Sequence, residues 1–419
     1  MARRLLVTVA LLVGLPALQP AVPAGAAGAD PYVVVLDDSV KDPKAVADEH
    51  AAEHGVNVFR VYRHALKGYA AMISPNRVDD VEAEDQVAFL SADRPVHAVA
   101  QTLPTGVNRI EGDVSSTKSG DGTGTVNVAV AIIDTGIDID HPDLNVAGGR
   151  NCSTGRSFDD GNGHGTHVAG TVAAKDDNEG VVGMVPGAPL YAVRVLNNAG
   201  SGSWSSVICG VDWVTANSAS TGIKVANMSL GGSGTDDGNC GNSNNDALHK
   251  AICNSVAKGV TYVVAAGNDG RDFKDFVPAA YNEVLTVSAM ADFNGLPGGG
   301  AAATCRSDVD DTAADFSNFT TTGSTDESHT IAAPGVCILS TWKGGGTRTI
   351  SGTSMASPHT AGTAALCITG SCSGMTPSQV MQKLRSDAAA RPASYGFKDD
   401  PNSPNGNRYY GYLVYAGGY

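Results

Sequence analysis

The run Val126-Asn127-Val128-Ala129-Val130-Ala131-Ile132-Ile133, which ends in Asp134, indicates the fold class of this 419-residue chain. The run is almost wholly apolar, as expected of a strand that is covered on both faces. Similar runs follow, and helical segments separate them. This alternation predicts an α/β domain over residues 101–419, with a doubly wound, mainly parallel sheet. The further expected strands are 190–195, 223–228, 260–265 and 284–288, and the expected helices are 164–174, 204–216, 245–258, 353–366 and 377–385.

The segment 30–100 has a different character, because it lacks cysteine and is rich in charged residues. Its pattern predicts six elements in the order βαββαβ, a small ferredoxin-like α+β sandwich. A domain of about 70 residues without cross-links is marginally stable alone, so we expect it to dock on a partner. The expected elements are a strand at 32–36, a helix at 44–54, paired strands over 58–74, a helix at 78–84 and a strand at 87–90.

The first residues are typical of an export signal. Arg3 and Arg4 precede a mostly apolar stretch over 5–15, and small residues follow. Ala27-Gly28-Ala29 fits a cleavage site and gives a signal peptide over 1–29, while Ala24-Gly25-Ala26 is an alternative site. The apolar stretches that follow are too short to span a bilayer. The sequence therefore predicts a secreted protein that is free of the membrane once the signal is removed.

Charge and cysteine content agree with export. The net charge is −15, and lysine and arginine form no cluster of the kind that binds nucleic acid, so a nucleic-acid partner is not expected. The eight cysteines are an even number in an exported chain, which favours disulfides over metal ligation. The pairing stays open, although Cys367 and Cys372 are close enough in sequence for a local bridge.

Three polar residues lie in distinctive surroundings. Asp134 ends the first buried strand, His164 opens a helix in Gly163-His164-Gly165-Thr166-His167, and Ser354 lies among small residues at another helix start. Taken singly, they fit a turn residue, a structural histidine and a helix cap. His164 and His167 lack the third ligand and the His-Glu-x-x-His spacing of a zinc enzyme. The three segments together favour a shared catalytic site.

The segments IIDTGID (132–138), NGHGTHVAG (162–170) and SGTSMASPH (351–359) resemble those of the subtilisin-like serine protease family. The likeness covers residues 101–419 and extends to secreted, proteinase K-like members. It implies a catalytic triad of Asp134, His164 and Ser354, in the family's chain order Asp, His, Ser. Ser354 would be the nucleophile, His164 the general base and acid, and Asp134 the group that orients the imidazole. His167 would then be structural.

The same resemblance implies further site residues. The Asn268 side chain and the Ser354 backbone N–H would form the oxyanion hole. An extended peptide would pair as a strand between two glycine-bearing edges. The substrate-binding residues implied are Gly200, Ser201, Gly202, Ser229, Leu230, Gly231, Ala265, Ala266 and Gly267. Segment 30–100, through Lys67-Gly68-Tyr69-Ala70-Ala71, resembles the inhibitor-type propeptide, which assists folding, inhibits the enzyme and is cut near residues 98–100.

The expectation is therefore a monomeric, secreted serine endopeptidase that cleaves polypeptides with broad, apolar-leaning specificity, with Phe276 lining the pocket. Its chemistry requires no cofactor. Many members of the family bind structural calcium, but the acidic stretches 236–246 and 308–311 show no ligand spacing that would place it and fit a solvated acidic loop better, so a calcium site stays unplaced.

Two rival functions fit less well. A lipase-type hydrolase needs Gly-x-Ser-x-Gly, yet position 356 is alanine. A non-catalytic binding module on a protease scaffold would lack a triad or oxyanion residue, and each of these is present in the sequence.

Overall fold

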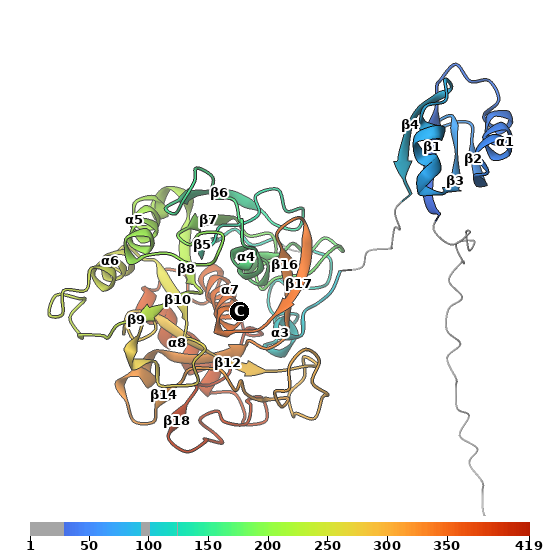
Figure 1. Cartoon of the computed structure of the whole chain (residues 1–419). Coiled ribbons are helices and arrows are strands. Elements are labelled where there is room, and N and C mark those ends of the chain that lie inside the picture. Colours follow the sequence, from blue (N-terminus) through green and yellow to red (C-terminus); the bar gives the residue numbers. More distant parts are fainter. Residues whose placement is uncertain (1–28, 94–100, 124) are drawn as a thin grey trace, which may run out of the picture. The chain divides into compact units, whose positions relative to one another are not determined.

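The computed structural model describes residues 29–93, 101–123 and 125–419, which form two compact units (Figure 1). The smaller unit spans residues 29–93 and the larger unit spans 101–419. The expected signal peptide, apart from its last residue, and the expected processing segment at 98–100 lie outside the described residues.

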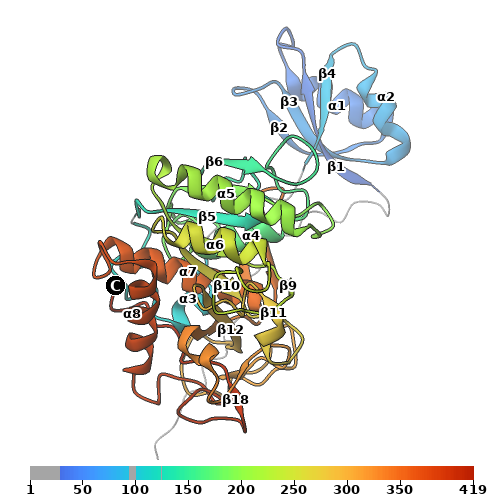
Figure 2. The same ribbon diagram turned by 90° about the vertical axis from the view of Figure 1, so that its left-hand side faces the viewer.

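The smaller unit has the predicted βαββαβ order. Its antiparallel sheet has the strand order β2-β3-β1-β4, and both helices pack against it (Figure 2). Asp42 caps the first helix by accepting from the N–H groups of Lys44 and Ala45, and Gly55 ends it in the left-handed conformation. The elements are β1 (Asp30–Leu36), α1 (Pro43–His54), β2 (Asn57–Tyr62), β3 (Gly68–Ile73), α2 (Val78–Glu82) and β4 (Val87–Ala92).

The larger unit is built on the predicted mainly parallel sheet. The strand order is β13-β12-β10-β8-β5-β7-β6, with β15 also paired to β12. Every pair in this sheet is parallel except β12 with β13. Its strands are β5 (Ala129–Asp134), β6 (Val146–Asn151), β7 (Leu190–Arg194), β8 (Ile223–Met228), β10 (Thr261–Ala265), β12 (Leu285–Ala291), β13 (Thr312–Ala313) and β15 (Thr330–Pro334).

Helices cover both faces of this sheet. Side chains alternate along a strand, so Val130 and Ile132 join the core beneath α4 and α7, while Ala131 and Ile133 join the core beneath α5 and α6. This arrangement explains why β5 is apolar at every position before its last residue, Asp134. The helices are α4 (His164–Ala173), α5 (Trp204–Thr221), α6 (Ala247–Val256), α7 (Thr353–Thr369) and α8 (Pro377–Ala389).

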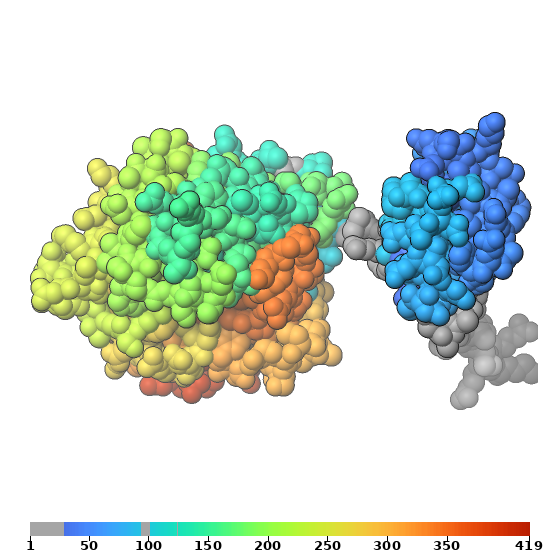
Figure 3. Space-filling view, turned by 45° about the horizontal axis from the view of Figure 1, so that its top comes forward, coloured from blue at the N-terminus to red at the C-terminus, as the bar shows by residue number. Residues whose placement is uncertain are grey.

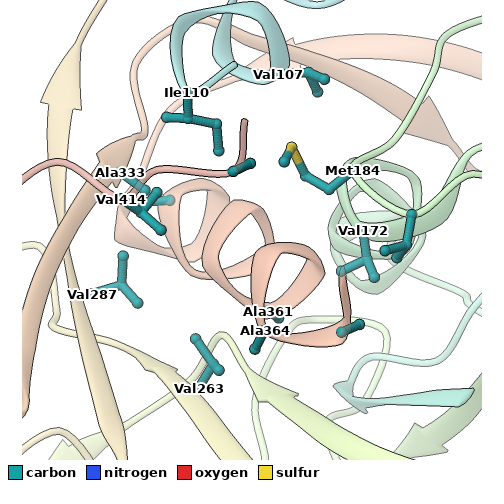
Figure 4. Close-up of a cluster of buried hydrophobic side chains, with 14 of the residues drawn as sticks. Val107, Ile110, Val172, Met184, Val263, Val287, Ala333, Ala361, Ala364 and Val414 are labelled. Carbon is teal, nitrogen blue, oxygen red and sulfur yellow. The ribbon is translucent and has the colours of Figure 1, made fainter. Parts of the chain in front are cut away.

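Helix α7 runs through the middle of one core (Figure 4). Small side chains such as Ala361 and Ala364, both fully buried, allow Val263 and Val287 of the sheet to pack nearby. This burial holds the N-terminus of α7, which carries Ser354, in a fixed place.

Several short elements were not predicted. They include the sheet strands β6, β13 and β15. Outside the large sheet they include α3 (Thr105–Arg109), the strand pairs β9 (Gly232–Ser233) with β11 (Phe276–Val277) and β14 (Thr320–Thr321) with β18 (Arg408–Tyr409), and the hairpin of β16 (Ile338–Trp342) and β17 (Gly346–Ile350). The hairpin lies at the surface (orange in Figure 3), where the Lys343 ammonium donates to Gly161 O at 2.6 Å. It therefore supports the loop that precedes His164.

Several predicted boundaries were wrong, among them the ends of α7, α8 and β12, and two of them have a local cause. The strand begins at Ala129 rather than Val126, because Val126 N bonds to Pro186 O in a loop instead of joining the sheet. Helix α5 continues past residue 216 to Thr221 and stops only at Gly222, whose φ of 76° is left-handed.

Four disulfides join all eight cysteines, which confirms the preference for bridges over metal ligation. The pairs are Cys152–Cys209, Cys240–Cys253, Cys305–Cys337 and the expected local bridge Cys367–Cys372. Among the helices of the described residues, none combines the length and the hydropathy that crossing a membrane requires.

Candidate active site

Asp134 and His164 form a direct pair at the carboxyl end of β5. Asp134 is fully buried, and its Oδ1 lies 2.7 Å from His164 Nδ1. The same oxygen accepts the Thr135 N–H at 2.7 Å, which fixes the carboxylate. A carboxylate only accepts, so His164 Nδ1 carries the proton and Nε2 is left with a free lone pair. This arrangement suits Nε2 as a general base.

The loop before His164 is organised by Asp160, a residue that the sequence analysis missed. Asp160 Oδ1 accepts the N–H groups of Asn162 and Gly163, and Oδ2 accepts that of Thr166 at 2.9 Å. These bonds satisfy free donors at the start of α4 and set the position of His164, its first residue. The available signal was an aspartate four residues before the histidine, in a glycine-rich loop.

The pKa values of the two histidines of α4 are shifted in opposite directions. Burial alone would lower the pKa of His164, but the charge and hydrogen bond of Asp134 outweigh it and raise the pKa above the ordinary value. Burial lowers the pKa of His167 to about 3, so His167 is neutral. Its Nε2 donates to the carbonyls of Ile338 and Arg348 at 3.0 Å. His167 thus has the expected structural role of tying α4 to the β16–β17 hairpin.

Ser354 is the second residue of α7 and is held against Ser229. The Ser354 hydroxyl donates to Ser229 O at 3.3 Å, and the Ser229 hydroxyl donates to Ser354 O at 2.8 Å. Asn227 supports this contact by donating to the Ser229 hydroxyl at 2.9 Å. In the described part of the chain Ser354 Oγ makes no hydrogen bond to His164, and such catalytic contacts often form only with substrate bound.

Asn268 lies beside the start of α7 with its amide oxygen occupied. Asn268 Oδ1 accepts from Thr353 N at 2.8 Å and from Thr353 Oγ1 at 2.9 Å. Its Nδ2 is therefore the atom that is left to donate to a bound group. Gly352 precedes α7 and has no side chain that could accept a hydrogen bond from the N–H groups at this partly positive helix end.

The two predicted edge segments line one cleft with His164. The cleft has a volume of about 730 Å³ and includes residues 200–202 and 229–231. It also contains Leu196, Trp204 and Val207, which the sequence analysis did not identify. Ala265, Ala266 and Gly267 do not line this cleft; the Gly267 N–H instead donates to Thr353 Oγ1 at 3.1 Å, next to the α7 terminus.

Phe276 lies between the second edge and the Asn268 segment. A Cβ at Gly231 would come within 2.4 Å of the Phe276 ring, and one at Gly267 within 3.0 Å. Both positions therefore require glycine while the ring is in place. The ring is half-buried, so it presents an apolar surface between the two segments.

The α/β fold brings an aspartate–histidine pair and a serine at a helix N-terminus to one cleft, which is the set of groups that a serine hydrolase uses. The Subtilase family model matches residues 125–412, and the Peptidase inhibitor I9 model matches residues 31–98. Subtilisin DY from Bacillus licheniformis is 39% identical over 293 residues, 69% of this chain and 92% of that protein. Subtilisin E from Bacillus subtilis (strain 168) is 34% identical over 342 residues, 80% of this chain and 79% of that protein.

The solved structure of a cold adapted subtilisin-like serine proteinase is also similar to this chain. It is 30% identical, has a TM-score of 0.55 and covers 74% of this chain and 97% of its own. The chain belongs to the subtilase family and is a serine endopeptidase preceded by an inhibitor-type propeptide. This assignment favours the enzyme over the alternative of a non-catalytic binding module.

Proposed function

We propose that Asp134, His164 and Ser354 form the catalytic triad of this endopeptidase. The observation that carries the proposal is the 2.7 Å contact between Asp134 and His164, made in a cleft that both expected substrate edges line. Ser354 joins this site through its two hydrogen bonds with Ser229, another residue of the cleft.

In this mechanism an extended peptide binds between residues 200–202 and 229–231 through backbone hydrogen bonds. Ser354 Oγ attacks the scissile carbonyl carbon while His164 Nε2 takes the hydroxyl proton. Asn268 Nδ2 and the Ser354 N–H stabilise the negative oxygen of the tetrahedral intermediate. His164 then protonates the leaving amine as the C–N bond breaks, and water hydrolyses the acyl-enzyme by the reverse proton path.

The specificity is broad and leans towards apolar side chains. Among the described residues, those that line the cleft include Leu196, Trp204 and Leu230 but no aspartate, glutamate, lysine or arginine. Phe276 adds an apolar ring between the two substrate-binding segments. A library of peptides that differ at the residue before the cleaved bond tests this, and strong selection for lysine, arginine or glutamate would contradict it.

The chain is a precursor with three parts. Residues 1–29 act as the secretion signal, residues 30–100 as propeptide and residues 101–419 as the mature, monomeric, extracellular enzyme. The inhibitor-family match over 31–98 supports the propeptide as an intramolecular inhibitor. We infer that it also assists folding, and that the enzyme's own active site makes the cut near residues 98–100.

A calcium ion fits the loop after α4. The Asp143 carboxylate is buried, and the carbonyls of Lys175 and Glu179 converge on the Gln101 side-chain amide at 2.9 and 3.3 Å. The Asp177 carboxylate is close enough to raise the pKa of Asp143, after burial, which is the larger cause. The two carboxylates and the two carbonyls offer only oxygen, which suits Ca²⁺, whereas the Gln101 atom in contact with the carbonyls is Nε2 and is not counted as a ligand. These residues would hold the ion, which would neutralise the carboxylates and stabilise the loop without entering the chemistry.

The calcium proposal predicts that EGTA lowers the melting temperature and that added CaCl₂ restores it. Asp177→Asn should reduce both effects, whereas Asp212→Asn, an exposed change on α5, should leave them intact. A melting temperature that is insensitive to EGTA would contradict the proposal.

The triad is tested with the secreted protein and its Ser354→Ala variant. We expect peptide-bond hydrolysis by the first only, and an uncut precursor in the variant by N-terminal sequencing. Ser373→Ala, on an exposed turn after α7, is the matched control and should be active and processed. Equal activity in wild type and Ser354→Ala would exclude Ser354 as the nucleophile.

A further inference from the structure

Helix α7 contains a proline four residues after Ser354. In an α-helix each carbonyl accepts the N–H of the residue four positions later, so the Ser354 carbonyl would ordinarily accept from residue 358. Residue 358 is proline, which has no N–H and whose ring crowds that same carbonyl. Its neighbours Met355 and Ala356 are buried, and an unpaired carbonyl in such surroundings costs free energy. The Ser354 carbonyl therefore needs a donor from outside the helix.

The Ser229 hydroxyl supplies this donor. Its Oγ lies 2.8 Å from Ser354 O, and because a carbonyl only accepts, the hydroxyl proton points at that oxygen. Ser229 directly follows β8, so the bond ties the end of a sheet strand to the residue that carries the proposed nucleophile. The Ser354 hydroxyl donates in return to Ser229 O at 3.3 Å, so two bonds join the two residues.

Two further side chains fix the direction of the Ser229 hydroxyl. Since Ser229 Oγ gives its proton to Ser354 O, it can only accept from Asn227, and Asn227 Nδ2 donates to it at 2.9 Å. The other end of the same amide, Asn227 Oδ1, accepts from Ser357 Oγ at 2.7 Å. Asn227 and Ser357 are fully buried and Ser229 is 4% exposed, so bulk water does not compete for these bonds.

We propose that Ser229 is a positioning residue, whose hydroxyl holds Ser354 in place through the carbonyl that Pro358 leaves free. Asn227 and Ser357 orient that hydroxyl. The bonds begin and end on α7 and pass through the end of β8, so they hold the start of the helix against the sheet. A misplacement of about 1 Å can lower a rate by about 10²-fold, which makes such a restraint matter for the attack on substrate.

This inference rests on Ser354 as the proposed nucleophile. It gives the Ser229 side chain a role that is separate from the contact of its backbone with a bound peptide.

The test measures kcat per active site in Ser229→Ala, with active sites counted from the burst of product released by an acylating ester. We expect kcat to fall by about tenfold with little change in KM, because the nucleophile shifts while the backbone edge that binds substrate is kept. Ser288→Ala is the matched control, since Ser288 Oγ is fully buried and donates to Tyr410 O at 2.5 Å outside this set of bonds. It should lower the melting temperature but keep kcat.

Pro358→Ala provides the comparison that isolates the carbonyl of Ser354. Alanine restores an N–H at position 358, and a carbonyl oxygen has a second lone pair with which to accept it. Ser229→Ala made in the Pro358→Ala chain should therefore lower kcat by a much smaller factor than in the parent chain. A role of Ser229 in substrate binding or in general stability would give the same factor in both chains.

Ser357→Ala is a milder variant for the same comparison, because Ser229 keeps its hydroxyl and loses only part of its orientation. It should lower kcat less than Ser229→Ala, and less again in the Pro358→Ala chain. Full kcat in Ser357→Ala would overturn the assignment of Ser357.

Equal factors of loss for Ser229→Ala in the two chains, or an unchanged kcat per active site in Ser229→Ala, would overturn the proposal. Ser354→Ala separates this failure from that of the triad. Wild-type activity in Ser354→Ala would overturn the triad and this inference with it. An inactive Ser354→Ala beside a fully active Ser229→Ala would overturn this inference alone.

Discussion

At the scale of single residues, the proposed mechanism depends on which nitrogen of His164 carries the proton. Asp134 accepts the hydrogen bond from His164 Nδ1, so Nε2 is the base in the proposed triad. In Asp134→Asn the amide can donate to Nδ1 and so favour the opposite tautomer, in which Nε2 is protonated. We expect kcat to fall by about 10⁴-fold. Steady-state kinetics on a peptide substrate measure this, with Asp140→Asn, an exposed neighbouring aspartate, as the control that should keep full activity.

The pH profile gives an independent check on the same pair. Because the pKa of His164 is raised above its ordinary value of 6.5, the general base becomes protonated, and activity is lost, as pH falls through that raised pKa. Asp134→Asn removes the charge that raises the pKa, so the acid limb of its residual kcat/KM should move to lower pH. An acid limb at the same pH in both proteins would show that Asp134 does not set the pKa of His164.

At the scale of elements, the proposed oxyanion site lies where the loop after β10 meets the start of α7. Thr353 Oγ1 donates to Asn268 Oδ1 at 2.9 Å and accepts the Gly267 N–H at 3.1 Å. Thr353→Val has nearly the same shape but removes both bonds. We expect a lower kcat with little change in KM, and a loss smaller than the roughly 10²–10³-fold known for removing an oxyanion donor itself.

Thr353→Ser, which keeps the hydroxyl, is the matched variant and should restore most of the lost kcat. Comparing kcat and KM for the two variants separates positioning of Asn268 from general damage to the helix. A Thr353→Val enzyme with unchanged kcat, or with only a raised KM, would show that Thr353 does not position the oxyanion donor.

The sequence analysis predicted residues that lie in contiguous motifs and missed residues that reach the site through packing. Asp134, His164 and Ser354 each lie in a contiguous motif at the end of one strand or the start of one helix, so pattern alone could indicate them. Leu196 and Trp204 flank the predicted edge 200–202 in sequence, but whether their side chains face the cleft depends on how α5 packs against β7, which no local pattern records. The pair β9–β11 is only two residues long in each strand, and pairing rather than propensity defines it.

At the scale of the whole molecule, one disulfide links the edge of the large sheet to a helix that covers it. The bridge Cys152–Cys209 joins the chain just after β6, an edge strand, to α5 on one face of the sheet. The two cysteines are 57 residues apart, so the bridge shortens a long loop in the unfolded chain. This pairing could not be chosen from sequence, because the fold alone brings these residues together.

Loop length sets the expected contribution of this bridge. In the chain-entropy account, closing a loop of this length contributes about 4 kcal/mol to the free energy of unfolding. Replacing both residues, Cys152→Ala with Cys209→Ala, should therefore lower the unfolding free energy by about that amount. Denaturant titration of the full chain carrying Ser354→Ala measures this without self-digestion. All three tryptophans lie in the larger unit, so their fluorescence follows its unfolding alone.

Ser153→Ala with Ser206→Ala is the control pair, since it changes the same two segments and leaves the bridge closed. Surface changes of this kind shift stability by about 0.5 kcal/mol or less. A decrease of less than about 1 kcal/mol in the unfolding free energy of the variant without both cysteines would contradict the entropic account. It would show that the folded or the unfolded chain compensates for the open loop. A decrease in the unfolding free energy near the full expected value would mean that the edge of the sheet depends on a covalent link to α5. The loop that leads to His164 would then depend on the same link.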